Sequence, residues 1–236
     1  MEDTYLTESI FIRNNQMYYD NVDSQIKIKS HNWHRYLNEI GWTKLQKQWI
    51  RKLNSFLDKP KNNSLFGILD CGGEGNCLFH CLSFALDKGT NYQDIRNLLS
   101  KQITQEKYQE LISIYRIIDE SGEFEESWDP HTISYDDFKE LIIRGGNEYW
   151  GDSLLLNLLH QTLSINIFVL YSNEINQEYY HYSLMVPYDE TKETIILLYE
   201  NEMHFQVVGY FKGGLMVYKF KDNEIPLEIR RLVKLR

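Results

Sequence analysis

The amino-acid sequence predicts an α+β fold, in which a small, mostly antiparallel or mixed sheet is packed between helices. Two observations favour this class. Between residues 77 and 163, apolar side chains recur at helical spacing in several segments. After residue 164 the period changes, and short runs rich in Ile, Val, Tyr and Leu follow one another. With 236 residues, the chain suits one domain with an appended N-terminal element.

The N-terminal end of the chain predicts a β-hairpin. The apolar runs 9–13 and 16–19 flank Asn14 and Asn15. Asparagine tolerates positive φ angles, which tight hairpin turns require. Residues 25–29 alternate between polar and apolar side chains and form a candidate third strand.

A helix is predicted after this hairpin. Thr43 and Gln46 have the spacing of a capping box, and apolar residues at helical spacing continue to about Leu57. The polar stretch 60–64 is the best linker candidate. We therefore expect an N-terminal extension at residues 1–60, a main domain at 61–221 and a basic C-terminal tail at 222–236.

The middle of the chain predicts helices and its end predicts strands. The expected helices cover residues 77–86, 92–103, 104–118, 134–144 and 153–163, and the expected strands cover 165–171, 180–186, 194–199, 205–208 and 215–220.

The segment between the third and fourth of these helices is acidic. It suits a solvated loop, and it also suits a contact for a basic partner; both interpretations stay open. The acidic side chains are Asp119, Glu120, Glu123, Glu125, Glu126 and Asp129.

The composition excludes several classes of protein. A formal charge of −9 speaks against a nucleic-acid surface, and no apolar run is long enough to span a membrane. The N-terminus lacks the basic start and apolar core of a signal peptide. The three cysteines are close together and odd in number, which indicates a reducing, cytoplasmic setting. We expect a monomer. Abundant Asn, Ile, Lys and Tyr hint at a large DNA virus or an intracellular bacterium as the source, and hence at host cytosol.

A glycine-rich turn precedes the first of the central helices. Gly72, Gly73 and Gly75 allow a sharp turn, and Cys77 then stands at the helix N-terminus. The positive end of the helix stabilises a thiolate there. The backbone N–H groups of Gly75, Asn76 and Cys77 are candidate donors to a developing oxyanion. This is the nucleophilic half of a cysteine-hydrolase site.

His204 is the candidate base. It follows a predicted strand and a short polar turn, and it begins the next strand. Alternate residues of a strand share a face, so Glu202 and Gln206 lie on the same side as His204. Such a neighbour orients the imidazole as the third member of a triad does.

Three blocks of this sequence resemble the ovarian-tumour (OTU) family of cysteine deubiquitinases. Residues 73–79, Gly-Glu-Gly-Asn-Cys-Leu-Phe, resemble the family signature Gly-Asp-Gly-Asn-Cys-Leu-Phe. Residues 150–152, Trp-Gly-Asp, with the following helix and strand, resemble the Trp-Gly-Gly block. Residues 196–206 resemble the closing strand, turn and histidine block. The blocks occur in family order and span residues 64–220.

The resemblance implies a papain-like α+β fold that hydrolyses isopeptide bonds at the C-terminus of ubiquitin or a ubiquitin-like modifier. Cys77 would be the nucleophile and His204 the general base, with the turn before Cys77 as the oxyanion hole. The expected partners are ubiquitin or polyubiquitin conjugates, without nucleic acid, membrane, metal or other cofactor.

The chain departs from the family pattern at two positions. Glu74 stands where the family often has Asp, and Gln206 stands where it usually has Asn or Asp. The third member of the triad therefore stays open. The first candidates are Gln206 and Glu74, followed by Glu202 and Asp70.

Other classes are weaker fits. A ubiquitin-binding module without activity would suit the two departures, but it would not need both Cys77 and His204. A dinucleotide-binding turn at Gly73 and Gly75 lacks its third glycine, where Leu78 stands. A zinc site at the cysteines lacks a second ligand pair elsewhere in the chain.

Overall fold

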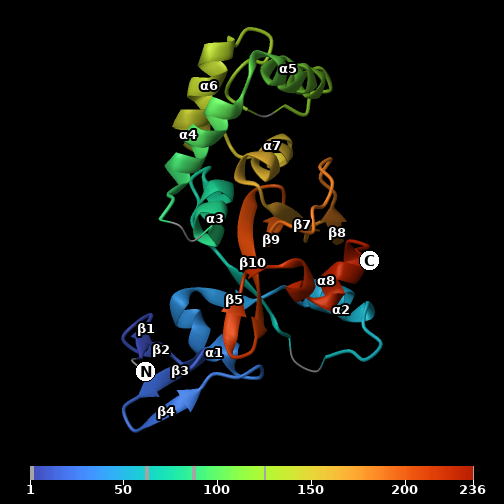
Figure 1. Cartoon of the computed structure of the whole chain (residues 1–236). Helices are drawn as coiled ribbons and strands as arrows, with labels where there is room; N and C mark the ends of the chain where they lie inside the picture. Colours follow the sequence, from blue (N-terminus) through green and yellow to red (C-terminus); the bar gives the residue numbers. More distant parts are fainter. Residues whose placement is uncertain (1–2, 62–63, 87–88, 125, 236) are drawn as a thin grey trace. The chain divides into compact units, whose positions relative to one another are not determined.

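The first of two sheets is built by the N-terminal end of the chain. The structure is a computed structural model that describes residues 3–61, 64–86, 89–124 and 126–235 (Figure 1). Asn14 and Asn15 have φ angles of 51° and 57° and join β2 to β3, so the predicted hairpin is confirmed. Four antiparallel strands lie in chain order: β1 (Thr4–Tyr5), β2 (Ile10–Arg13), β3 (Gln16–Asn21) and β4 (Ser24–Lys27).

The second sheet contains the strands from the end of the chain. Its order is β5-β6-β10-β9-β7-β8, with β11 beside β10 and β12 beside β9, and every pair with a defined register is antiparallel. The strands are β5 (Trp42–Lys44), β6 (Phe66–Leu69), β7 (Asn166–Asn173), β8 (Glu178–Tyr182), β9 (Thr194–Glu200), β10 (His204–Lys212), β11 (Leu215–Val217) and β12 (Lys219–Phe220).

One helix boundary predicted from the sequence is wrong. Thr43 does not cap a helix, because it lies in β5 and pairs with Ile68 of β6. The helix α2 (Lys47–Ser55) begins later, after Gln46, whose side chain makes no capping hydrogen bond. Strand pairing with a distant segment has overridden the local capping pattern.

Two tryptophans of the N-terminal segment pack against glycines of the second sheet. Gly67 of β6 and Gly209 of β10 lie opposite each other. A Cβ atom on Gly67 would stand 2.9 Å from the Trp33 ring, and one on Gly209 would stand 2.7 Å from the Trp42 ring. The two glycines therefore make room for indole rings that are almost completely buried.

Contacts divide the chain into two compact units. The first comprises residues 1–70, 168–183 and 189–236 and contains both sheets. Its helices are α1 (Trp33–Tyr36), α2, α8 (Leu227–Leu232) and the 3₁₀ turns η1 (Leu37–Ile40) and η3 (Asp222–Glu224), and α8 in the basic tail packs against α2.

The second unit, residues 71–167 and 184–188, is helical. Side chains cap four of its helices: Asn91, Thr104, Ser134 and Asp152. Its elements are α3 (Cys77–Leu86), α4 (Tyr92–Gln102), α5 (Gln105–Glu120), α6 (Tyr135–Arg144), η2 (Gly146–Glu148) and α7 (Ser153–Leu163). The five central helices are confirmed, and helices together with antiparallel strands confirm the α+β class.

The acidic segment after α5 is anchored by aromatic packing. Trp128 lies edge-on to Tyr115, with ring centroids 5.0 Å apart, and it also contacts Phe138 and Tyr149. Burial and, second, the charge of Asp152 together raise the pKa of Glu126 from 4.5 to about 7. The segment is thus partly embedded in the helical unit. Glu125 lies outside the described residues.

Candidate active site

The glycine-rich turn forms a tight loop in front of α3. Gly72, Glu74 and Gly75 have positive φ angles of 129°, 57° and 73°. The Asn76 N–H donates to the Gly73 carbonyl over 3.1 Å and closes the turn. Cys77 is the first residue of α3 and only 7% exposed. The chain thus delivers the thiol to a helix N-terminus, where the dipole of the helix favours a negative charge.

Gly75 is the point of closest packing in this turn. A Cβ atom there would lie 2.1 Å from the carbonyl oxygen of Gly146 and 2.9 Å from the Trp150 ring. No side chain fits such a gap, and the positive φ angle adds strain for any residue other than glycine. Gly146, together with Trp150 of the Trp-Gly-Asp block, therefore packs directly against the turn that precedes Cys77.

Asp152, the last residue of the Trp-Gly-Asp block, holds the helix that follows it. Its carboxylate accepts from the Leu154 and Leu155 N–H groups and so caps α7. The same carboxylate accepts from the Tyr115 hydroxyl over 2.5 Å. This aspartate therefore acts as a structural anchor of the helical unit.

Arg96 of α4 lies behind the turn and was missed by the sequence analysis. Its guanidinium donates to the Asn76 Oδ1 atom over 2.9 Å and to the Gly75 carbonyl over 3.1 Å. It also donates to the carbonyls of Ile142 and Tyr149 over 3.0 and 3.2 Å. The Asn76 Oδ1 atom accepts a second hydrogen bond from the Gly146 N–H, over 3.2 Å.

A signal for Arg96 is present in the sequence. Ile95 and Leu99 mark the buried face of α4, and Arg96 is fully buried beside them. An arginine on an apolar helix face needs partners for its five donors. An arginine on the apolar face of this helix therefore predicts a buried polar site, but the sequence does not identify the residues that form it.

His204 begins β10, as the sequence predicts, and pairs with Glu200 of β9. Its Nε2 atom lies 3.2 Å from the Asp70 Oδ1 atom, and the two side chains are 29% and 60% exposed. The pairing of Val207 with Leu69 places the end of β6 beside β10, which brings Asp70 to the imidazole. Asp70 is the candidate that the sequence analysis ranked among the last.

The other candidates for the third position lie elsewhere. The Gln206 Oε1 atom is buried and accepts no hydrogen bond from the described residues. The Glu202 carboxylate accepts from the Tyr171 hydroxyl over 2.5 Å. Glu74 lies exposed in the turn before Cys77. Among these residues, the structure pairs only Asp70 with His204, and the role of Gln206 stays a prediction.

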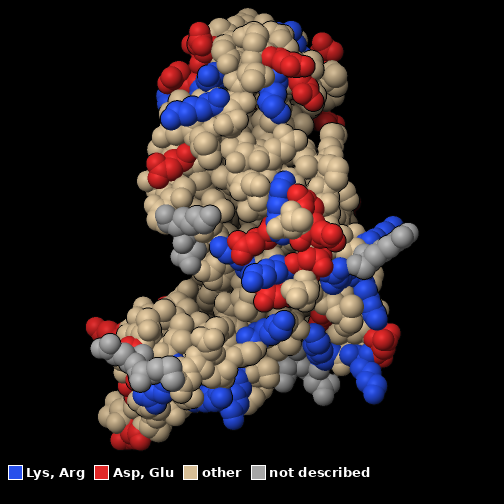
Figure 2. All heavy atoms as spheres, in the orientation of Figure 1, with Lys and Arg blue, Asp and Glu red and all other residues tan. Residues whose placement is uncertain are grey.

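The candidate site offers no metal centre in the part of the chain that is described, because no group of three or more His, Cys, Asp or Glu side chains there is placed to hold an ion. Likewise, none of the described helices is long and apolar enough to cross a membrane. On the face shown in Figure 2, acidic and basic side chains are interspersed.

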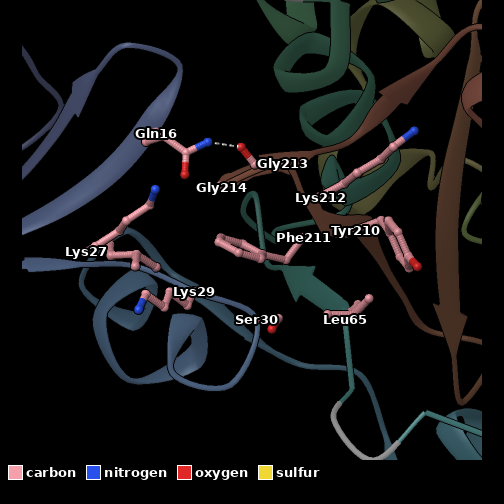
Figure 3. A pocket seen from close by; sticks show the side chains of 11 residues that line it. Gln16, Lys27, Lys29, Ser30, Leu65, Tyr210, Phe211, Lys212, Gly213 and Gly214 are labelled. Carbon is pink, nitrogen blue, oxygen red and sulfur yellow. Dashed lines mark hydrogen bonds between the residues drawn. The ribbon is translucent and has the colours of Figure 1, made fainter.

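A cavity of about 530 Å³ lies in the sheet-containing unit, at the opposite end of β10 from His204 (Figure 3). The Phe211 ring points into it, and the Gln16 side chain closes one side by donating to the Gly213 carbonyl. This cavity is separate from the imidazole and its carboxylate. Its lining residues are Gln16, Lys27, Ile28, Lys29, Ser30, Leu65, Tyr210, Phe211, Lys212, Gly213 and Gly214.

Comparison with known proteins finds similarity among solved structures. No profile of a known family matches the chain, and no curated protein sequence does. An OTU domain in complex with ubiquitin is 14% identical, with a TM-score of 0.41 over 71% of this chain and 81% of that chain. The OTU domain protease of Dera Ghazi Khan virus is 19% identical, with a TM-score of 0.43 over 62% and 82%.

A third similar structure is an OTU deubiquitinase from Wolbachia pipientis wMel bound to ubiquitin. It is 16% identical, with a TM-score of 0.42 over 68% of this chain and 98% of that chain. All three structures are described as OTU proteins.

Proposed function

We propose that this chain is a cysteine-dependent deubiquitinase, which hydrolyses isopeptide bonds at the C-terminus of ubiquitin or of a ubiquitin-like modifier. The observation that carries the proposal is the turn at Gly75 and Asn76, which rests against Gly146 and presents Cys77 at a helix N-terminus. The close packing at Gly75 holds this turn in one geometry. This geometry suits a nucleophile beside donors for an oxyanion.

The proposed reaction has two steps. The Cys77 thiolate attacks the carbonyl carbon at the ubiquitin C-terminus, and the backbone N–H groups of Gly75 and Cys77 stabilise the oxyanion. The Asn76 N–H, which the sequence also made a candidate donor, instead closes the turn on the Gly73 carbonyl. Protonated His204 then gives its proton to the leaving lysine amine, and a thioester remains. Next, His204 takes a proton from water, the hydroxide attacks the thioester, and ubiquitin leaves with a free carboxylate while the thiol is restored.

Asp70 is the proposed orienting group for His204. Its oxygen lies beside the Nε2 atom of the imidazole. A carboxylate in this place stabilises the imidazolium that forms when the thiolate does. Gln206 and Glu74 remain the alternatives to be tested.

Ubiquitin conjugates in the cytosol of a host cell are the proposed setting. A reducing compartment keeps a nucleophilic thiol from being oxidised. The net charge of −9 favours association with a partner that has a basic face or tail. In this proposal residues 61–221 carry the catalysis, and residues 1–60 extend the sheet to which His204 belongs through the pairing of β5 with β6.

The proposal is tested with ubiquitin that carries a thiol-reactive group at its C-terminus. We expect an adduct at Cys77 in the intact chain, identified by mass. Cys77→Ala should abolish the adduct, and His204→Ala should slow its formation strongly, because the two residues act as a unit. A folded wild-type protein that forms no adduct would contradict the proposal.

The second candidate is an OTU-like module that binds ubiquitin without cleaving it. Glu74 and Gln206, which replace the usual family residues, are the features that favour it. A titration with unmodified ubiquitin distinguishes the two. Binding without adduct formation would establish the module, whereas adduct formation excludes it.

A further inference from the structure

Arg96 is a buried cation that forms no ion pair with any carboxylate among the described residues. Its side chain is fully buried, and each of its hydrogen-bond partners among the described residues is a neutral oxygen. Burying a charge is costly unless hydrogen bonds and an opposite charge compensate it. We therefore looked for an anionic group close enough to Arg96 to compensate its charge.

The surroundings of Arg96 are built to hold its guanidinium. The group lies over the Phe79 ring, with Cζ 3.9 Å from the ring centroid. Gly145 has a φ angle of 56°, and a Cβ atom there would stand 2.1 Å from Cζ. Any side chain at Gly145 would displace the arginine. The helix end before η2 is thus shaped around this one group.

The hydrogen bonds of Arg96 converge on the residues just before Cys77. The Nε atom fixes the Asn76 side chain, and a terminal nitrogen fixes the Gly75 carbonyl. Because the peptide group is planar, a hydrogen bond to the carbonyl oxygen also fixes the direction of the N–H group of the next residue. Arg96 therefore fixes the peptide between Gly75 and Asn76, whose N–H closes the turn on the Gly73 carbonyl, and so anchors the turn that carries Cys77.

Charge provides a second link between Arg96 and Cys77. Burial lowers the pKa of Arg96 to about 10, and the negative charges of Tyr149, Tyr92 and Cys77, when ionised, raise it. This coupling is reciprocal, because a cation that gains from a thiolate also stabilises that thiolate. Of these three groups, only a cysteine beside a helix N-terminus is readily ionised near neutral pH.

We propose that Arg96 is a positioning residue for Cys77, which holds the Gly75–Asn76 turn in the geometry of an oxyanion hole and provides the buried positive charge that favours the thiolate. This inference rests on the proposed function of Cys77 as nucleophile. The two parts of the role are separable, since the hydrogen bonds need the forked guanidinium and the charge does not.

The test uses two variants, Arg96→Lys and Arg96→Ala, in the full chain. Arg96→Lys keeps the charge and loses most of the hydrogen bonds. Arg96→Ala loses both. Arg116→Ala is the matched control, because Arg116 is a half-buried arginine of the same unit whose Nε donates to the Pro130 carbonyl over 2.9 Å, away from the turn.

The first measurement is the rate at which iodoacetamide alkylates Cys77 as a function of pH, followed by mass on the peptide that contains Cys77. The thiolate sulfur displaces iodide in this reaction, so the rate reports the thiolate fraction. We expect the pH midpoint to rise by about one unit or more in Arg96→Ala, which is about tenfold slower alkylation below the midpoint. Arg96→Lys and Arg116→Ala should keep the midpoint of the wild type.

The second measurement is turnover of a fluorogenic ubiquitin substrate. We expect Arg96→Lys to lower kcat by about 100-fold with little change in KM, because an oxyanion hole acts in the transition state. Arg116→Ala should keep kcat within about twofold of the wild type. Wild-type kcat in Arg96→Lys would overturn the geometric part of the proposal.

The alkylation assay needs no ubiquitin, so it separates this inference from the proposed function. An unchanged alkylation midpoint in folded Arg96→Ala would overturn the electrostatic part, whatever the substrate. If Arg96→Ala does not fold, free guanidinium added during refolding should restore it by filling the vacated cavity. Should Arg96→Ala then stay unfolded and Arg96→Lys keep full turnover, Arg96 would be a folding residue only.

Discussion

The two halves of the candidate site are built in opposite ways. The nucleophile half is buried: Gly75 is packed against the Gly146 backbone, and the fully buried Arg96 holds the turn from behind. The base half is open: His204 is 29% exposed and its carboxylate partner Asp70 is 60% exposed. A buried, backbone-defined geometry leaves no room for substitution, whereas an exposed side-chain pair can be weakened by degrees. A single substitution in the nucleophile half should therefore abolish most of the activity, whereas substitutions in the base half should lower the activity by smaller steps.

The largest effect is expected at Gly75. Gly75→Ala places a methyl group 2.1 Å from the Gly146 oxygen and forces the turn to move. We expect kcat/KM to fall by at least about 100-fold, because displaced N–H groups no longer meet the oxyanion. The unfolding temperature should fall as well, and a steady-state assay with a thermal melt measures both.

Gly73→Ala is the matched control for this change. Gly73 belongs to the same turn, but a Cβ atom there would meet nothing within 4 Å. Its activity should stay close to that of the wild type. Equal losses of activity in the two variants would show that the turn tolerates no added side chain at any position. The contact of Gly75 with Gly146 would then not be the cause of the loss.

An intermediate effect is expected at Asp70. Asp70→Asn removes the charge beside the His204 Nε2 atom and keeps the shape of the side chain. We expect kcat/KM to fall by about 10- to 100-fold, which is less than in a serine protease because a thiolate is formed before attack. Kinetics with a fluorogenic ubiquitin substrate give the ratio.

Gln206→Ala and Glu74→Gln, measured alongside, decide between the alternatives for the third position. Both should retain most of the activity if Asp70 orients the imidazole. A larger loss in Gln206→Ala than in Asp70→Asn would reinstate the interpretation that the sequence favoured.

The smallest effect is expected at Glu126, which is outside both halves. Its pKa is raised from 4.5 to about 7, first by burial and second by Asp152. The folded state therefore binds more protons than the unfolded state between these values, and the free energy of unfolding decreases as the pH rises through that window. Glu126→Gln removes this loss, so it should raise the unfolding temperature at about pH 8 and have little effect near pH 4.5.

Glu123→Gln is the control for this prediction. Glu123 belongs to the same acidic segment and is exposed. Its substitution should change the unfolding temperature equally little at both pH values. A pH-independent shift in Glu126→Gln would mean that the carboxyl group is not protonated in the folded protein at neutral pH.

Local chemistry made part of this structure predictable from the sequence. Asn14 and Asn15 allow the hairpin turn, Ser134 caps its helix, and the glycines before Cys77 allow the positive φ angles of the nucleophile turn. Each of these features depends on residues only a few positions apart. The change from helical to alternating periodicity fixed the α+β class for the same reason.

Tertiary structure alone decided the partners of the site residues. Asp70 reaches His204 because β6 pairs with β10, and Arg96 reaches Gly75 because α4 packs against α3. Thr43 is a strand residue because β5 pairs with β6. These contacts join segments far apart in the chain, and their energies come from pairing and burial that no local pattern contains. The sequence by itself therefore determined which residues stand at the turn and at the strand end, and the packing of distant segments determined which groups hold them there.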